Sequence, residues 1–135
     1  MVEHVEIDGI LHAIIIRNEY SRPGIQFFTP ENFSQQLAHM SHPKGKRIEP
    51  HIHNVVERSV ALTQEVLVIK KGILRVDFYH ANHKFAESRE LKSGDVILLA
   101  TGGHGFEILE DAEIAEIKQG PYLGDNDKVR FEVSE

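Results

Sequence analysis

The sequence of 135 residues contains no cysteine, which excludes disulfides, thiolate zinc sites and cysteine nucleophiles. No apolar run approaches the roughly 20 residues that a membrane-spanning helix needs. The first six residues also lack the basic and then apolar pattern of a signal peptide. We therefore expect a cytoplasmic protein with no membrane partner. Its length and 41% hydrophobic content predict one domain, residues 1–135, with an apolar core.

Positive charge is scarce. Fifteen Lys and Arg face twenty-one Asp and Glu, a formal net charge of −6. An acidic surface repels phosphate backbones, so we expect no nucleic-acid partner. Histidine, by contrast, is abundant, with nine residues. Because imidazole is the commonest metal ligand and the usual general base, the placement of these histidines is where function is expected to show.

Short apolar, β-branched stretches alternate with turn residues along most of the chain, at intervals typical of an all-β sandwich or barrel. One short helix is expected over 30–38, with Thr29 as its N-cap and Pro30 as its first helical residue. The expected strands are 5–7, 10–16, 65–69, 73–80, 96–100, 106–109, 112–118 and 129–133.

His51 and His53 form the first candidate constellation. On a strand, residues two apart point to the same face, so both imidazoles can reach one ion. The alternative is an exposed strand with two solvated histidines, because His-x-His is a short motif.

Glu65 and His104 are the other two candidates. Glu65 shares the face of Leu67 and Ile69 at the head of an apolar strand, so a buried carboxylate there needs a cation or hydrogen bonds. The alternative is an exposed strand end. His104 lies in the glycine-rich stretch 101–105, whose turns can aim an imidazole inward.

Together these residues resemble the two motifs of the cupin superfamily. In the first motif the matching residues are Gly45, His51, His53, Glu65 and Gly72. In the second they are Gly94, Ala100, Gly102 and His104. The resemblance spans about 37–118 and implies a double-stranded β-helix, the cupin or jelly-roll barrel, within which His51, His53, Glu65 and His104 hold a metal.

The chain departs from the cupin pattern in three places. The gap between His53 and Glu65 is longer than usual, and Glu57, which has the usual short spacing, is kept as the alternative ligand. The second motif has Ala100 where the family has proline, and His104 arrives one residue early.

Three imidazoles and one carboxylate suit a divalent transition metal such as Fe, Ni, Zn or Mn. The resemblance implies a small polar or sugar-like ligand in the barrel and a homodimer, and it leaves open whether the reaction is that of an oxygenase or an isomerase. The strand-rich N-terminus offers strands that could pair across the dimer interface. A second reading is a metal-independent nucleotide-sugar ketoisomerase or epimerase with a histidine base. The chain is similar to those enzymes in the His-x-His start and the 122–127 tail, but carries Gln64 one residue before Glu65. A third is a non-catalytic sugar or effector binder.

Overall fold

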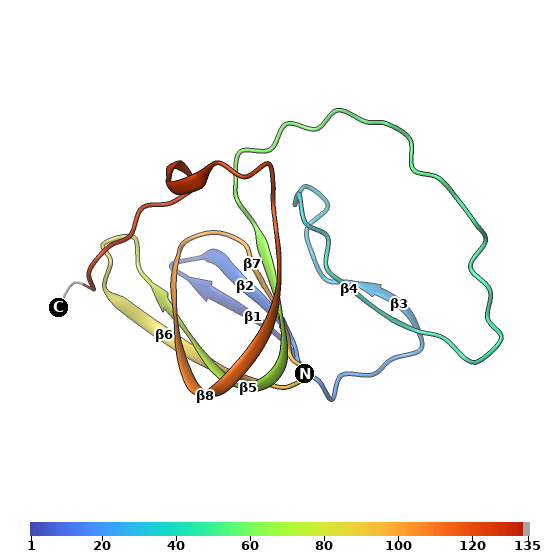
Figure 1. Ribbon diagram of the computed structural model, residues 1–135, viewed down its shortest axis with the longest axis horizontal. Helices are drawn as coiled ribbons and strands as arrows, with labels where there is room; N and C mark the ends of the chain where they lie inside the picture. The colour runs from blue at the N-terminus through green and yellow to red at the C-terminus, as the bar shows by residue number, and fades with distance from the viewer. Residues whose placement is uncertain (134–135) are drawn as a thin grey trace.

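The chain folds almost entirely into β-strands. The structure is a computed structural model that describes residues 1–133. Within this range the only helical element is a short 3-10 turn, η1, near the C-terminal end (Figure 1), and no helix has the length and apolar character of a membrane span. The elements are β1 (Val2–Ile7), β2 (Ile10–Ile16), β3 (Gly24–Phe27), β4 (Ala38–Ser41), β5 (Glu65–Tyr79), β6 (Phe85–Lys92), β7 (Val96–Leu99), β8 (Gly103–Lys118) and η1 (Gly124–Asp127).

The main sheet is antiparallel and curled into a half-barrel (Figure 1). Its strands follow the order β1-β2-β7-β5-β6, and β8 pairs with β5 as well. The strands β3 and β4 form a separate two-stranded sheet beside it. The N-terminal strands β1 and β2 pair with each other, as the Asp8-Gly9 turn predicts, because both turn residues adopt positive φ angles of 54° and 76°.

The centre of the main sheet is buried on both faces. In β2, Ala13 and Ile15 join the core inside the half-barrel, while Ile14 and Ile16 pack into a second cluster on the outer face. Residues 20–37 cover that outer face with Tyr20, Phe28, Phe33 and Leu37. This two-sided burial explains why β2 is a continuous apolar run rather than an alternating one.

The helix expected over 30–38 is wrong, because these residues form turns and the start of β4. The Thr29 hydroxyl accepts a hydrogen bond from the Leu37 backbone N–H, 3.2 Å away, instead of capping a first helical turn. The Gln36 side-chain amide donates to the carbonyls of Pro30 and Phe33, both at 2.9 Å. The side chain of Gln36 therefore satisfies backbone acceptors that a helix would pair internally.

Two other expectations about the strands need correction. The stretches 65–69 and 73–80 form one strand, β5, which bends at Gly72 with a φ of 84°. The stretches 106–109 and 112–118 likewise belong to one strand, β8. Residues 129–133, expected as a last strand, have no regular structure.

Residues 42–64, between β4 and β5, have no helix or strand and arc away from the half-barrel (Figure 1). Every side chain from 42 to 63 is exposed, whereas Gln64 is only 2% exposed. Its carboxamide oxygen accepts hydrogen bonds from the Ser34 hydroxyl and the Gln35 backbone N–H. The segment is thus anchored at Gln64, one residue before Glu65.

Candidate functional site

The curvature of β5 and β8 brings His104 beside Glu65. In the ladder between these strands, Glu65 pairs with Lys118 at one end and His104 pairs with Phe78 near the other. Nevertheless the Nε2 atom of His104 lies 3.0 Å from Oε1 of Glu65. The side chains are 29% and 13% exposed, so the pair is largely shielded but still reachable from solvent.

A second carboxylate, Glu116, lies beside this pair. The hydrogen bond from His104 is the main cause that lowers the pKa of Glu65 to about 2, partly opposed by burial. The hydrogen bond to Glu65 is the main cause that raises the pKa of Glu116. Glu65 is therefore the ionised member of the carboxyl pair, and Glu116 is the one that retains a proton more readily.

The C-terminal part of the chain forms one wall of the site. Asp127 accepts a hydrogen bond from the Thr63 hydroxyl at 2.6 Å and an ion pair from the Lys118 ammonium at 3.3 Å. These contacts lower the pKa of Asp127, the Thr63 hydrogen bond contributing most. They enclose a pocket of about 300 Å³ lined by Thr63, Glu65, His104, Phe106, Glu116, Lys118, Asp127 and Lys128.

A second pocket, of about 450 Å³, adjoins the first at His104 and Lys128. Its wall includes Tyr79 and Phe131, whose rings meet edge to face with centroids 5.3 Å apart. Phe131 also stacks on His83 at 4.1 Å. The ionisable groups around Glu65 thus lie next to an aromatic surface, a combination suited to a small ligand with polar groups and an apolar ring face.

The structure brings together two of the four predicted ligands and not the other two. His51 and His53 lie on the exposed segment 42–64, with ring centroids 5.2 Å apart, and His51 Nδ1 is bonded to the carbonyl of Glu49 at 2.9 Å. Glu57, the alternative carboxylate, is exposed on the same segment. Across residues 1–133, no three His, Asp or Glu side chains are grouped to hold a metal ion.

The donor set at Glu65 and His104 therefore falls short of a metal site in this arrangement. A catalytic zinc site, for example, has three protein ligands and a structural one has four. Glu65 and His104 supply one oxygen and one nitrogen donor, and the two imidazoles that would complete the set lie outside the pocket.

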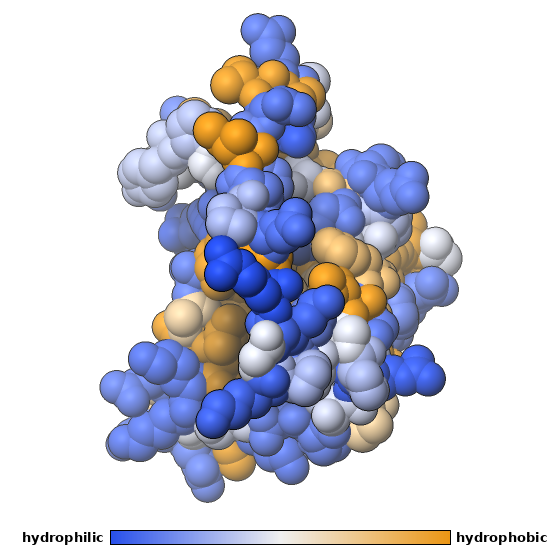
Figure 2. Space-filling model, turned by 90° about the vertical axis from the view of Figure 1, so that its right-hand side faces the viewer, coloured by the Kyte–Doolittle hydropathy of each residue, from blue (hydrophilic) through white to orange (hydrophobic). Residues whose placement is uncertain are grey.

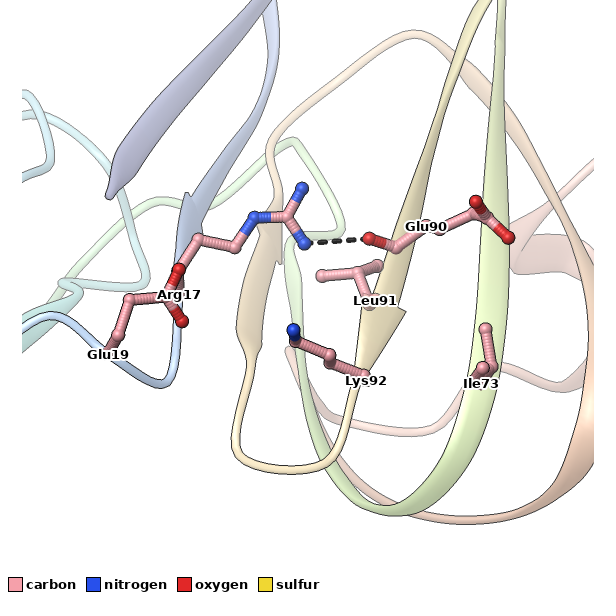
Figure 3. A pocket seen from close by; sticks show the side chains of 6 residues that line it. All are labelled: Arg17, Glu19, Ile73, Glu90, Leu91 and Lys92. Atoms are coloured by element: carbon pink, nitrogen blue, oxygen red, sulfur yellow. Dashed lines mark hydrogen bonds between the residues drawn. The ribbon is translucent and has the colours of Figure 1, made fainter.

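A third pocket, of about 360 Å³, lies between β2 and β6 and shares no residue with the site (Figure 3). Its most polar group, the Arg17 guanidinium, donates to the Glu90 carbonyl at 2.7 Å, as the figure shows. The same guanidinium pairs with Glu3 at 2.6 Å and with the buried Asp95 at 3.1 Å. All these contacts are internal, so Arg17 has a structural role here.

Sequence reasoning missed Glu116, Lys118 and Thr63. The alternation of Ile114, Glu116 and Lys118 could have placed these residues on one face of a strand, the face on which Ile114 packs against the core and Glu116 and Lys118 line the pocket. No local sequence pattern marks Thr63. It lies at the site because the Gln119 backbone N–H donates a 2.9 Å hydrogen bond to the carbonyl of Gln64 and so holds the two segments together.

Comparisons of the chain with protein-family models, with curated proteins and with solved structures found no match. The fold and the geometry of the site therefore carry the functional argument.

Proposed function

We propose that this chain is a small cupin-type protein that binds a divalent transition metal (Fe, Ni, Zn or Mn) and acts on a small polar or sugar-like molecule. Its curled sheet would form part of a double-stranded β-helix. The observation that supports the proposal most is the 3.0 Å contact between His104 and Glu65. These residues were selected as ligands from two separate motifs 39 positions apart, and they meet at the edge of a pocket.

The protonation of Glu65 fits the same role. Metal ligands must be deprotonated, so protons compete with metal for a carboxylate of ordinary pKa in weak acid. With its pKa lowered to about 2, Glu65 is ionised throughout the neutral and mildly acidic range. A transition metal held by His51, His53, Glu65 and His104 would supply a Lewis acid for a substrate oxygen or for water.

The proposal assigns the remaining two ligand positions to His51 and His53. It requires the exposed segment 42–64 to take a different course in the metal-bound protein, hinged at the anchored Gln64. Glu57 lies on the same segment and is the competing carboxylate.

Metal analysis of untagged protein purified without chelators tests this proposal. We expect close to one equivalent of a transition metal, most of it lost in the double variant His51→Ala/His53→Ala. His42→Ala, on the same exposed segment, is the matched control and should retain the metal. Full metal content in the double variant would contradict the ligand assignment, and metal-free native protein would contradict metal binding altogether.

The same contact favours a second candidate, a metal-independent isomerase or epimerase of a nucleotide-linked keto sugar. If His104 donates its Nε2 proton to Glu65, its Nδ1 atom keeps a lone pair and can accept a proton from a carbon next to the sugar carbonyl. Glu65 would then orient the imidazole and stabilise its protonated form. A non-catalytic binder would use the same two pockets without any proton transfer.

Proton exchange separates these candidates. The isomerase should incorporate solvent deuterium into a nucleotide-linked keto sugar after treatment with EDTA, and His104→Ala should abolish the exchange. Exchange that depends on added metal would favour the metal proposal. If a nucleotide-linked keto sugar binds but no deuterium is exchanged, with or without metal, the non-catalytic binder is the candidate that remains.

A further inference from the structure

The exposed segment between β4 and β5 carries an unusual number of uncovered apolar side chains. Ile52 and Val55 are 91% and 101% exposed, and Ile48 and Val56 are each 54% exposed. Figure 2 faces the side of the molecule on which the segment lies and shows hydrophobic side chains standing among hydrophilic ones. Several large apolar side chains exposed on one short segment make that segment a candidate interaction site.

The apolar residues of this segment follow the period of a β-strand. From 47 to 57, the even positions carry Ile48, Pro50, Ile52, Asn54 and Val56, whereas the odd positions carry polar side chains except at Val55. Asn54 is the polar exception among the even positions. This alternation is typical of a half-buried strand, yet the segment pairs with no strand in residues 1–133. Within residues 1–133 its backbone therefore takes part in no strand ladder, and its apolar side chains remain exposed.

The segment is complementary to itself in an antiparallel arrangement centred on Ile52. In that register Ile52 faces Ile52 of the second copy, and Ile48 faces Val56. Arg47 faces Glu57, which places opposite charges across the pair. A two-fold axis generates each contact twice, as expected of an isologous interface.

Pro50 fits this register. In an antiparallel ladder, alternate residues direct their N–H and C=O groups toward the partner strand. If the odd residues make those bonds, Pro50 directs its nitrogen away from the partner, where a missing N–H costs nothing. The even residues then form the non-hydrogen-bonded pairs, whose side chains lie closest.

We propose that residues 47–57 form a β-strand that pairs antiparallel with the same strand of a second copy of this chain, with Ile52 on the two-fold axis. The pairing ends at Arg47 and Glu57, because Lys46 and Arg58 beyond them would face each other with like charge. The interface lies on this segment and not on the N-terminal strands. The inference rests on the alternation, exposure and charge of the segment, and it applies to the metal-free arrangement, since the proposed metal site would draw His51 and His53 toward Glu65.

The absence of cysteine allows a direct test by cross-linking. In the proposed register the Cα atoms of the two residues 52 are about 4.5 Å apart, within the range of about 4.4–6.8 Å that a disulfide spans. The two residues 55 are six positions apart along the paired strands, about 20 Å. In a glutathione redox buffer, Ile52→Cys should therefore form a covalent dimer readily, while the equally exposed Val55→Cys should not. Equal cross-linking of the two variants, or none in either, would overturn the proposal.

Sedimentation velocity supplies a test without an added thiol. With metal removed by EDTA, the wild-type chain should sediment as a dimer and Val56→Lys as a monomer. Val55→Lys should remain a dimer, because its ammonium group faces Glu49 of the second copy. Both side chains are solvent-exposed in the monomer, so neither change threatens its fold. Arg47→Glu and Glu57→Arg should each weaken the dimer, and the two combined should restore it. A monomeric wild type, or loss of the dimer in Val55→Lys alone, would contradict the register.

Discussion

His104 Nε2 lies 3.0 Å from Glu65 Oε1, although the two residues stand at opposite ends of the ladder between β5 and β8. Only strong curvature of these long strands can close that distance, because a flat ladder would separate its ends by tens of ångströms. The bend at Gly72 and the register shifts near Lys71 and Ile73 supply the curvature. The fold thereby converts a sequence separation of 39 residues into one ionisable pair.

The lowered pKa of Glu65 predicts a specific loss of stability in acid. Its folded pKa, about 2, lies below the ordinary value of 4.5, so its contribution to stability is present above pH 4.5 and disappears as the pH falls toward 2. Replacement by Gln should destabilise the protein by about 1–2 kcal/mol at pH 6 and much less at pH 2. Urea unfolding across this pH range measures the difference.

The interpretation of that experiment depends on Glu116 and on a control variant at Glu110. The raised pKa of Glu116 works in the opposite direction, since its contribution is present below pH 4.5 and lost as the pH rises, so it reduces the slope. Glu110→Gln, at an exposed position of β8, should leave the pH dependence unchanged. A Glu65→Gln effect of the same size at every pH would show that lost packing, not ionisation, is responsible.

The two candidate carboxylates should respond differently to neutralisation. Glu65→Gln removes a partly buried, ionised ligand and should weaken metal affinity by about 10- to 100-fold, the loss typical of altered groups around a metal. Glu57→Gln changes an exposed side chain and should leave affinity within a few-fold. Isothermal titration with Zn²⁺ or Mn²⁺ measures both variants, and the reverse order would make Glu57 the ligand.

Replacing Asp95 should lower the stability of the fold, because its contacts are structural. It is fully buried and accepts hydrogen bonds from Arg17 and from the backbone N–H groups of Asn18 and Lys92. Asp95→Asn replaces an acceptor by a donor facing those groups and should lower the free energy of unfolding by about 2–3 kcal/mol. Thermal unfolding measures the loss, and exposed Asp111→Asn, the control, should stay within about 0.5 kcal/mol.

Alanine substitutions at Gly72 and Gly45 distinguish the cost of steric overlap from the cost of backbone strain. Both have positive φ, 84° and 90°, but a Cβ on Gly72 would lie 2.2 Å from the Asp111 carbonyl oxygen, whereas one on Gly45 would meet nothing within 4 Å. Gly45→Ala should destabilise by about 1 kcal/mol from strain alone. Gly72→Ala should destabilise by about 3 kcal/mol, because the overlap adds to the strain. Equal losses in denaturant titrations would rule out the close approach of β5 and β8.

Local patterns predicted the all-β class, the turns and most of the strands. The Asp8-Gly9 turn and the alternation of Leu74, Val76 and Phe78 are local properties, and the structure contains both. The helix over 30–38 failed because Thr29 and Gln36 satisfy the backbone in a non-helical turn that packs Phe33 and Leu37 on the sheet. The strand β6 is absent from the predictions because charged residues interrupt its pattern.

The sequence predicted individual residues of the site but not how they are arranged around the pocket. Glu65 and His104, predicted as metal ligands, lie in contact in the structure, in keeping with the need of a glutamate on an apolar face for a partner. Their companion Glu116 depends on how far β5 and β8 curl, which no short pattern encodes. The course of His51 and His53 could not be predicted from the strands of residues 65–118, because the side chains of residues 42–63 are all exposed and do not pack into the core.

The most direct test of the central claim is a crystal structure of the metal-loaded protein, with the ion located by its anomalous scattering. The account predicts one peak beside Glu65 and His104, with imidazole nitrogens of His51, His53 and His104 at about 2.1 Å from it. A peak bound by Glu65 and His104 while His51 and His53 stay on an outlying segment would contradict the four-ligand site. No peak at Glu65 under saturating metal would contradict metal binding at this pocket.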